Sequence, residues 1–171
     1  MNNKIPPQNI DAESDILGCC LLDPNAIGRI AEILMPEAFY VSAYQEIYKV
    51  ILELYHQDKP TDLVTVTSWL SDQKLLSKVG GKNQLAKLIE TVSAVNIDHL
   101  ANLVLDKYQR RQLIKTGNEI VELGYDTTQE ILEVLEQSEK KIFNLTANKK
   151  DKFQPKLINH VPFCPPTPAI A

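Results

Sequence analysis

Few residues of this 171-residue chain have the spacing that catalysis or metal binding requires. The histidines His56, His99 and His160 stand apart from one another and from the cysteines, so no zinc-ligand pattern is present. Cys19 and Cys20 are adjacent, and neighbouring helix positions point about 100° apart, which favours small core residues over a metal pair. No serine lies in a G-x-S-x-G nucleophile elbow. The sequence therefore predicts no catalytic residue, no metal site and no cofactor bound by this chain.

One glycine pair has a partial likeness to a phosphate-binding loop. A Walker A loop has the pattern G-x-x-x-x-G-K-[ST], in which glycine amides surround the phosphates and a hydroxyl binds magnesium. Lys82 follows the glycine pair, but Leu76 stands where the first glycine belongs and Asn83 stands where the hydroxyl belongs. Gly80 and Gly81 therefore predict a turn between helices and not a nucleotide site.

Four cations are close together in the chain: Lys107, Arg110, Arg111 and Lys115. Lys107, Arg111 and Lys115 are four residues apart, so they share one helical face. The pattern is typical of a solvated face, and it also fits contact with an acidic partner or with nucleic acid. Because 22 acidic residues outnumber 18 basic ones, a strongly basic nucleic-acid-wrapping protein is disfavoured. We expect any DNA contact to be weak or indirect.

The elements that would position these groups are predicted to be helices throughout. Apolar residues recur at helical spacing, and capping residues precede several of these runs. Asn9, Asp62 and Asn96 are predicted N-caps, Ser42 with Gln45 forms a capping-box pattern, and Pro24 is expected to begin the second helix. The stretch 63–67 alternates like a strand, but no partner strand is evident, so helix is preferred.

The longest predicted helix begins after Asn96 and ends at Leu123, with Gly124 just past its end and Gly117 as a further break. At 1.5 Å per residue it spans roughly 40 Å, which is more than a compact core of this size requires. We therefore expect part of it to project or to pack on another chain.

A final helix is predicted after the capping-box pattern of Thr127 with Glu130. An isolated helix of this length is marginal in water, so the helix either folds back on its own domain or docks on another chain. Its apolar stripe is the predicted partner-docking surface. The stripe consists of Ile131, Leu135, Ile142 and Leu145.

The chain is thus expected to have three parts. Residues 1–126 form an all-α orthogonal multi-helix bundle, residues 127–147 a linker or docking helix, and residues 148–171, with five of the ten prolines, an irregular tail. No apolar run approaches the length of a membrane-spanning helix, so no membrane association is expected. The cysteines form no disulfide framework, which favours a reducing, cytoplasmic setting.

Segments spread along residues 5–147 resemble the N-terminal domain of the bacterial replicative helicases of the DnaB family. The stretch at 139–143 is similar to the linker helix of that family. The other similar segments, in order, are PPQNIDAE (6–13), ILG (16–18), LLDP (21–24), FY (39–40), IY (47–48), KPTDLVT (59–65), VGG (79–81), residues 108–114 and ELGYD (122–126).

The resemblance implies a helical collar, built as a dimer or a trimer of dimers above a hexameric ATPase ring. It implies that the long helix belongs to a dimerising hairpin, that primase binds the collar, and that the last helix docks on the helicase motor domain of another chain. The motor, with its ATP and magnesium sites, is absent from this sequence. We therefore expect a chain that is not catalytic alone, as a truncated product, a paralogue or one piece of a split helicase.

Overall fold

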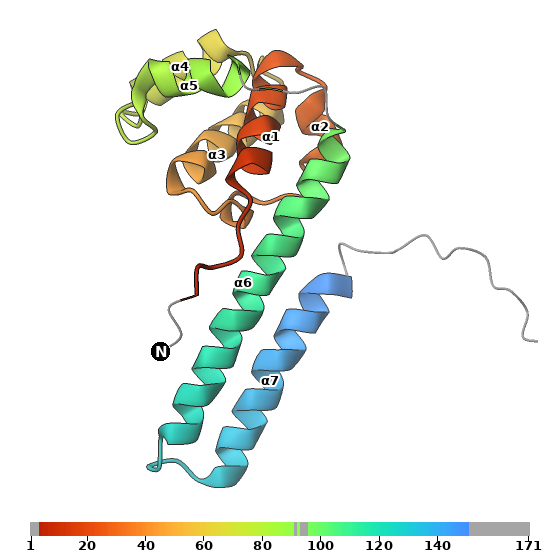
Figure 1. The fold of residues 1–171 in the computed structure, drawn as a ribbon, viewed down its shortest axis with the longest axis vertical. Coiled ribbons are helices and arrows are strands. Elements are labelled where there is room, and N and C mark those ends of the chain that lie inside the picture. The colour runs from red at the N-terminus through yellow and green to blue at the C-terminus, as the bar shows by residue number, and fades with distance from the viewer. Residues whose placement is uncertain (1–3, 91, 93–95, 151–171) are drawn as a thin grey trace, which may run out of the picture.

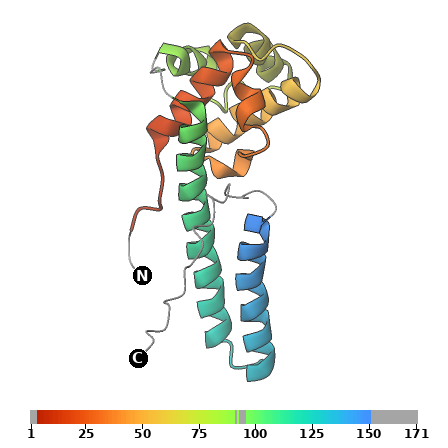
Figure 2. The same ribbon diagram turned by 90° about the vertical axis from the view of Figure 1, so that its right-hand side faces the viewer.

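The computed structural model describes residues 4–90, 92 and 96–150 of the chain. These residues form seven α-helices and one short 3-10 helix, and no strand occurs among them, which confirms the all-α class. Figures 1 and 2 show a head of short helices, a long helix α6 that extends from it, and a second long helix α7 that runs back beside α6. In chain order the elements are α1 (Ile10–Leu22), α2 (Ala26–Ile30), η1 (Pro36–Ala38), α3 (Ser42–His56), α4 (Leu63–Asp72), α5 (Gly81–Glu90), α6 (Ile97–Tyr125) and α7 (Ile131–Lys150).

Three helices begin at the N-caps that the sequence predicts. The Asn9 side chain accepts a hydrogen bond from the amide of Ala12 at 3.1 Å, which satisfies one of the free donors at the start of α1. Asp62 caps α4 by accepting from two backbone amides, so residues 63–67 are helical and not a strand. The Asn96 side chain caps α6 in the same way.

At three other predicted helix starts, the residues that the sequence predicts do not have the predicted role. No side chain caps α3; Val41 occupies its N-cap position, and Gln45 instead donates to the carbonyl of Phe39 at 2.8 Å. Pro24 lies in a turn, and α2 begins two residues later. Thr127 also lies in a turn, where the Asp126 carboxylate accepts from the backbone and hydroxyl of its neighbour Thr128.

The glycines of α6 do not break the helix. Gly117 and Gly124 both lie inside α6, which continues to Tyr125 and is followed by Asp126 at φ −79°. The predicted break at Gly117 and the predicted end of the helix at Leu123 are therefore wrong. A helical glycine costs about 1 kcal/mol relative to alanine, and the rest of α6 tolerates that cost.

The core of the head forms where α1 packs against α3, α5 and α6. Gly18 allows a close approach of α1 to α5, because a β-carbon at this position would lie 2.2 Å from the carbonyl oxygen of Leu88 in α5. In α3, the buried Tyr48 ring stacks at 4.8 Å on Phe39, and its hydroxyl donates to the carbonyl of Leu34. Every buried side chain of α6 lies between Ile97 and Leu105, so only the start of this helix belongs to the core.

The rest of α6 and the whole of α7 form a helical hairpin outside the head (Figures 1 and 2). The boundary expected between residues 126 and 127 falls in the turn of this hairpin. The linker or docking helix expected at residues 127–147 is thus α7, the second arm of this hairpin, and it runs on to Lys150. The tail expected at 148–171 lies, beyond that point, outside the described residues.

Candidate interaction surfaces on the helical hairpin

α7 packs along α6 through a narrow line of contacts. Val134 is the buried side chain at this junction, and the hydroxyl of Ser138, one turn later, donates to the Val134 carbonyl at 2.7 Å. A turn further, the Lys141 ammonium pairs with the Glu119 carboxylate of α6 at 2.6 Å, which holds the pKa of Glu119 below its usual value. The spacing of these positions places one face of α7 on α6, which is the fold-back alternative of the sequence analysis.

Most of the predicted docking stripe lies beside this junction and not in it. Ile131, Leu135 and Ile142 are exposed, with Leu135 at 58%, whereas Leu145 is half-buried. Packing of α7 on α6 therefore covers part of the stripe, and the other residues of the stripe are exposed to solvent. Two further exposed apolar side chains, which the sequence analysis missed, extend this α7 surface, defined here as Ile131, Leu132, Leu135, Ile142 and Phe143.

α6 carries a second exposed apolar surface that the sequence analysis did not identify. Its side chains are 50% to 82% exposed, and large apolar side chains gathered on one exposed helix are typical of an interaction site. Gly117 lies among them, and no contact within 4 Å is found for a β-carbon there, so no neighbour among the described residues requires this glycine. The helical spacing of the apolar residues indicates this surface, but the break predicted at Gly117 divides it in the sequence. The α6 surface consists of Leu113, Ile114, Val121 and Tyr125.

The four cations of the basic cluster have different surroundings. Arg110 pairs with Asp106 at 2.9 Å on the exposed side of α6, and Lys115 is exposed one turn beyond. Lys107 is half-buried, and Arg111 donates to two backbone carbonyls of the head. Nucleic-acid contact by this cluster stays a prediction, and Arg111 has structural partners that reduce its availability for it.

Arg111 and Glu13 together hold the backbone where the head meets the hairpin. The Arg111 guanidinium donates to the carbonyls of Pro7 at 2.8 Å and Ala38 at 2.5 Å. The buried Glu13 carboxylate accepts from the amides of Tyr40 at 2.8 Å and Val41 at 3.3 Å. Burial raises the pKa of Glu13, and these two amides and the Arg111 charge oppose that rise. The position of Glu13 in the sequence gives no sign of a partner 27 residues away, so this contact is not among the sequence predictions.

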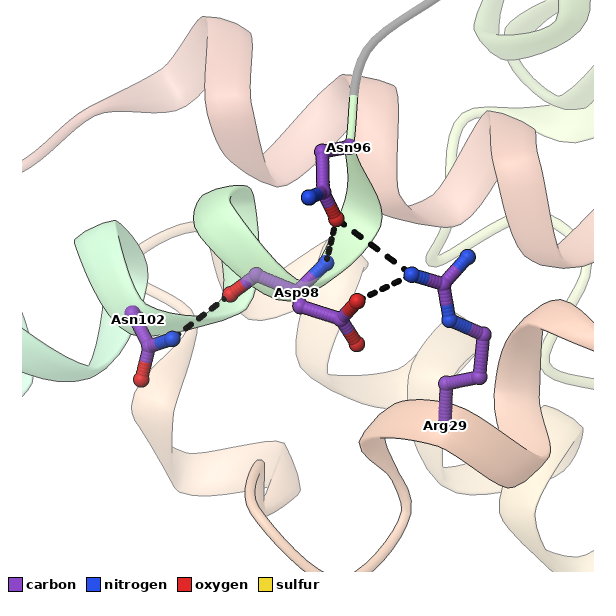
Figure 3. Close-up of polar contacts among 4 residues, drawn as sticks. All are labelled: Arg29, Asn96, Asp98 and Asn102. Atoms are coloured by element: carbon purple, nitrogen blue, oxygen red, sulfur yellow. Dashed lines mark hydrogen bonds and ion pairs between the residues drawn. The ribbon is translucent and has the colours of Figure 1, made fainter. Parts of the chain in front are cut away.

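A second polar contact joins the head to the start of α6. Figure 3 shows the Arg29 side chain of α2 reaching the Asp98 carboxylate and the Asn96 side-chain oxygen, the latter at 3.3 Å. Asn96 also caps α6, and Asn102 donates to the Asp98 carbonyl one turn later. These groups are largely exposed, so we expect them to orient the helix more than to stabilise the fold.

The described residues offer little that fits a metal ion or a nucleotide. No group of three or more histidine, cysteine or acidic side chains able to hold a metal occurs among them. Gly80 and Gly81 form the predicted turn with positive φ, and the Gly81 amide donates to the Leu76 carbonyl at 2.9 Å instead of facing a phosphate. Within the same residues, no helix has the length and apolar character needed to cross a membrane.

Sequence comparison relates most of the chain to one family. The family model described as the DnaB-like helicase N-terminal domain matches residues 5–106. The replicative DNA helicase DnaB of Nostoc sp. is 60% identical over 146 residues, covering 85% of this chain and 17% of that protein. The replicative DNA helicase DnaC of Bacillus subtilis is 39% identical over 150 residues, covering 87% and 33%. The chain therefore spans no more than a third of the length of these relatives.

Solved structures share the fold of most of the chain. The crystal structure of the N-terminal domain of DnaB helicase from Mycobacterium tuberculosis matches with a TM-score of 0.76 and 37% identity, covering 82% of this chain and 99% of that one. A DnaB-like replicative helicase, studied with its interactions with primase, matches with a TM-score of 0.67 and 23% identity, covering 81% and 31%. This second likeness concerns the fold alone.

Proposed function

Because the chain belongs to the DnaB-like helicase N-terminal domain family, we propose that it acts in DNA replication as a self-associating collar module. The observation that supports this most is the α6 surface, where Val121 is 55% exposed and Leu113 64% exposed on a helix outside the head. Burying such side chains against a second copy is favourable by about 25 cal/mol per Å² of apolar area.

Gly117 supports the same proposal. It lies three residues from Ile114 and four from Val121, so the three share one side of α6. Because the space that a β-carbon of Gly117 would face is open to 4 Å among the described residues, Gly117 leaves room for a helix of another copy to approach closely. The resemblance to the DnaB family suggests a dimer or a trimer of dimers as the assembly.

The α7 surface is proposed to dock on the motor domain of a helicase chain. Leu135 and Ile142 are exposed beside the hairpin junction, so they are free to contact a partner without opening the hairpin. ATP and magnesium are proposed to bind in that motor domain, since the turn at Gly80 and Gly81 does not have phosphate-binding geometry.

Primase is the third proposed partner, bound by the assembled collar. The similar helicase solved with its interactions with primase supports this proposal for a chain of the same fold. If primase binds the assembled collar, a variant of this chain that does not self-associate is expected to lose primase binding.

These proposals are tested by mixing the chain with the full-length helicase and its primase and measuring masses by light scattering. The chain is expected to form oligomers and to enter complexes with both partners. Leu135→Asp is expected to weaken binding to the helicase but not self-association, and Val121→Asp the reverse. A chain that stays monomeric and binds neither partner contradicts the proposed function.

A second candidate function is support of unwinding by a separate motor chain. It is motivated by the similarity of this chain to proteins named as replicative DNA helicases. ATPase and unwinding assays of a motor polypeptide, with and without the chain, test it. Stimulation is the expected result, and unchanged rates count against this candidate.

A further inference from the structure

The point where α6 leaves the head has an unusual set of contacts. Up to Leu105 the helix is anchored by buried apolar side chains, and Tyr108 still packs against the core. Arg111, less than one turn later, is attached to the head by hydrogen bonds to backbone carbonyls. Further along, Glu119 contacts α7 instead. Arg111 therefore lies at the junction between a helix held by the core and a helix held by its hairpin partner.

One guanidinium joins three separate segments at this junction. Its Nη1 donates to the carbonyl of Pro7, in the segment before α1, and its Nη2 donates to the carbonyl of Ala38, at the end of η1. Its central carbon lies 5.6 Å from the Tyr40 ring centroid and 5.8 Å from that of Tyr108. The planar fork of arginine can bond two acceptors while its face stacks on aromatic rings, which a lysine cannot do.

The backbone that Arg111 binds is itself fixed by other side chains. Glu13 of α1 accepts from the amides of Tyr40 and Val41, and Gln45 of α3 donates to the Phe39 carbonyl. The link between η1 and α3 is thus held by side chains from two helices, α1 and α3, in addition to Arg111. Arg111 consequently binds a rigid support, and α6 cannot swing about this point while both of its hydrogen bonds remain.

We propose that Arg111 is a positioning residue that sets the angle at which the hairpin leaves the head. The hairpin amplifies any change there: α6 runs 14 residues from Arg111 to Tyr125, about 21 Å, so a rotation of about 20° displaces the tip by about 7 Å. The angle depends on this chain alone. This angle also places the α6 surface for assembly, and that part of the inference rests on the proposed function.

The angle can be measured in the full chain by the distance between two spin labels. Lys49, exposed on α3, and Asn118, exposed on α6, are suitable positions. Labels attached to introduced p-acetylphenylalanine leave the native cysteines untouched, and dilution with unlabelled chain suppresses distances between copies. We expect a narrow distance distribution for the parent protein.

Arg111→Met is expected to broaden that distribution or shift it by several ångströms, because both carbonyl contacts are lost. Arg110→Met is the matched control: the neighbouring arginine pairs with Asp106 of the same helix, so an unchanged distribution is expected. Arg111→Lys keeps the charge and the stem, and it carries the test if the methionine variant does not fold. Since one ammonium is not expected to bridge both carbonyls, this variant should also broaden the distribution.

A folded Arg111 variant whose distance distribution has the same mean and the same width as that of the parent protein overturns the proposal, as does a change of the same size in Arg110→Met. Sedimentation of the same samples separates this inference from the proposed function. A monomeric parent protein contradicts self-association whatever the angle is, and an unchanged angle contradicts the role of Arg111 whatever the mass is.

Discussion

At the scale of single residues, the fold depends on a few close or charged contacts inside the head. Gly18 is one of them, because α1 and α5 approach so closely that a β-carbon would lie 2.2 Å from both the Leu88 carbonyl oxygen and a Val92 methyl. Glu13 is another, since its buried carboxylate is bonded to the backbone that leads into α3. Each contact gives a separate prediction.

Gly18→Ala is expected to destabilise the head. The added methyl forces α1 and α5 apart, and overpacking of this kind costs about 1–3 kcal/mol. Thermal unfolding followed by circular dichroism measures the loss. Gly124→Ala is the control: its β-carbon meets nothing within 4 Å, so stability should not fall. Equal melting temperatures for Gly18→Ala and the parent protein contradict this packing.

Glu13 is expected to make stability fall as the pH rises through the range above the ordinary carboxyl pKa. Burial raises the pKa of Glu13 in the folded chain, so the folded state holds its proton more tightly than the unfolded state does. Its contribution is therefore fully present below the unfolded pKa and is lost as the pH passes the folded value. Urea unfolding from pH 4 to pH 7 should show this slope in the parent protein and a smaller slope in Glu13→Gln. Identical slopes in the parent protein and in Glu13→Gln contradict a raised pKa of Glu13 in the folded chain.

At the scale of elements, hairpin formation and the surfaces it leaves exposed are the main features. Val134 and Leu135 are adjacent, but Val134 is buried against α6 and Leu135 is 58% exposed. This pair separates the contact that closes the hairpin from the surface proposed to dock elsewhere.

Val134→Asp is expected to open the hairpin, at a cost of about 2 kcal/mol or more, because a charge replaces a buried apolar side chain. Hydrogen exchange of the α7 amides should rise strongly in this variant. Leu135→Asp places the same charge one residue away, on the exposed side, and should leave exchange nearly unchanged. Equal exchange in the two variants means that α7 does not pack on α6 through Val134.

Gly117→Ala is expected to act in opposite directions on stability and assembly. Alanine favours the helix by about 1 kcal/mol relative to glycine, and the free space around Gly117 accepts the methyl. The unfolding free energy of the monomer should therefore rise. In an assembly that packs on the α6 surface, the same methyl should hinder close approach and weaken association. Stronger association together with higher stability contradicts the role proposed for Gly117.

The elements were largely predictable because helix signals are local. Asn9, Asp62 and Asn96 cap helices through bonds to amides two or three residues away, which the sequence displays directly. Gly117 and Gly124 misled the prediction because glycine ends a helix or lies within one according to its tertiary context. The contacts of Glu13 and Arg111 join segments tens of residues apart, and the spacing of residues cannot reveal them.

At the scale of the whole molecule, the head and the hairpin have different roles. The head buries nearly all of the core, whereas the hairpin extends from it with Val134 as its buried side chain. The boundary expected between residues 126 and 127 lies in the turn between the two arms, and the division into a collar domain and a docking helix stays a prediction. Because the hairpin exposes apolar side chains on both arms, self-association is the central claim about this molecule.

Sedimentation velocity over a series of protein concentrations tests that claim most directly. We predict that the parent chain sediments as a multiple of its 19.3 kDa mass, and that Val121→Asp on the α6 surface shifts it to the monomer. Val64→Asp is the matched control, since Val64 is an exposed valine of the head, at 76%, and should leave the mass unchanged. A parent chain that sediments at 19.3 kDa at every concentration, or a Val121→Asp variant that assembles equally well, contradicts the account.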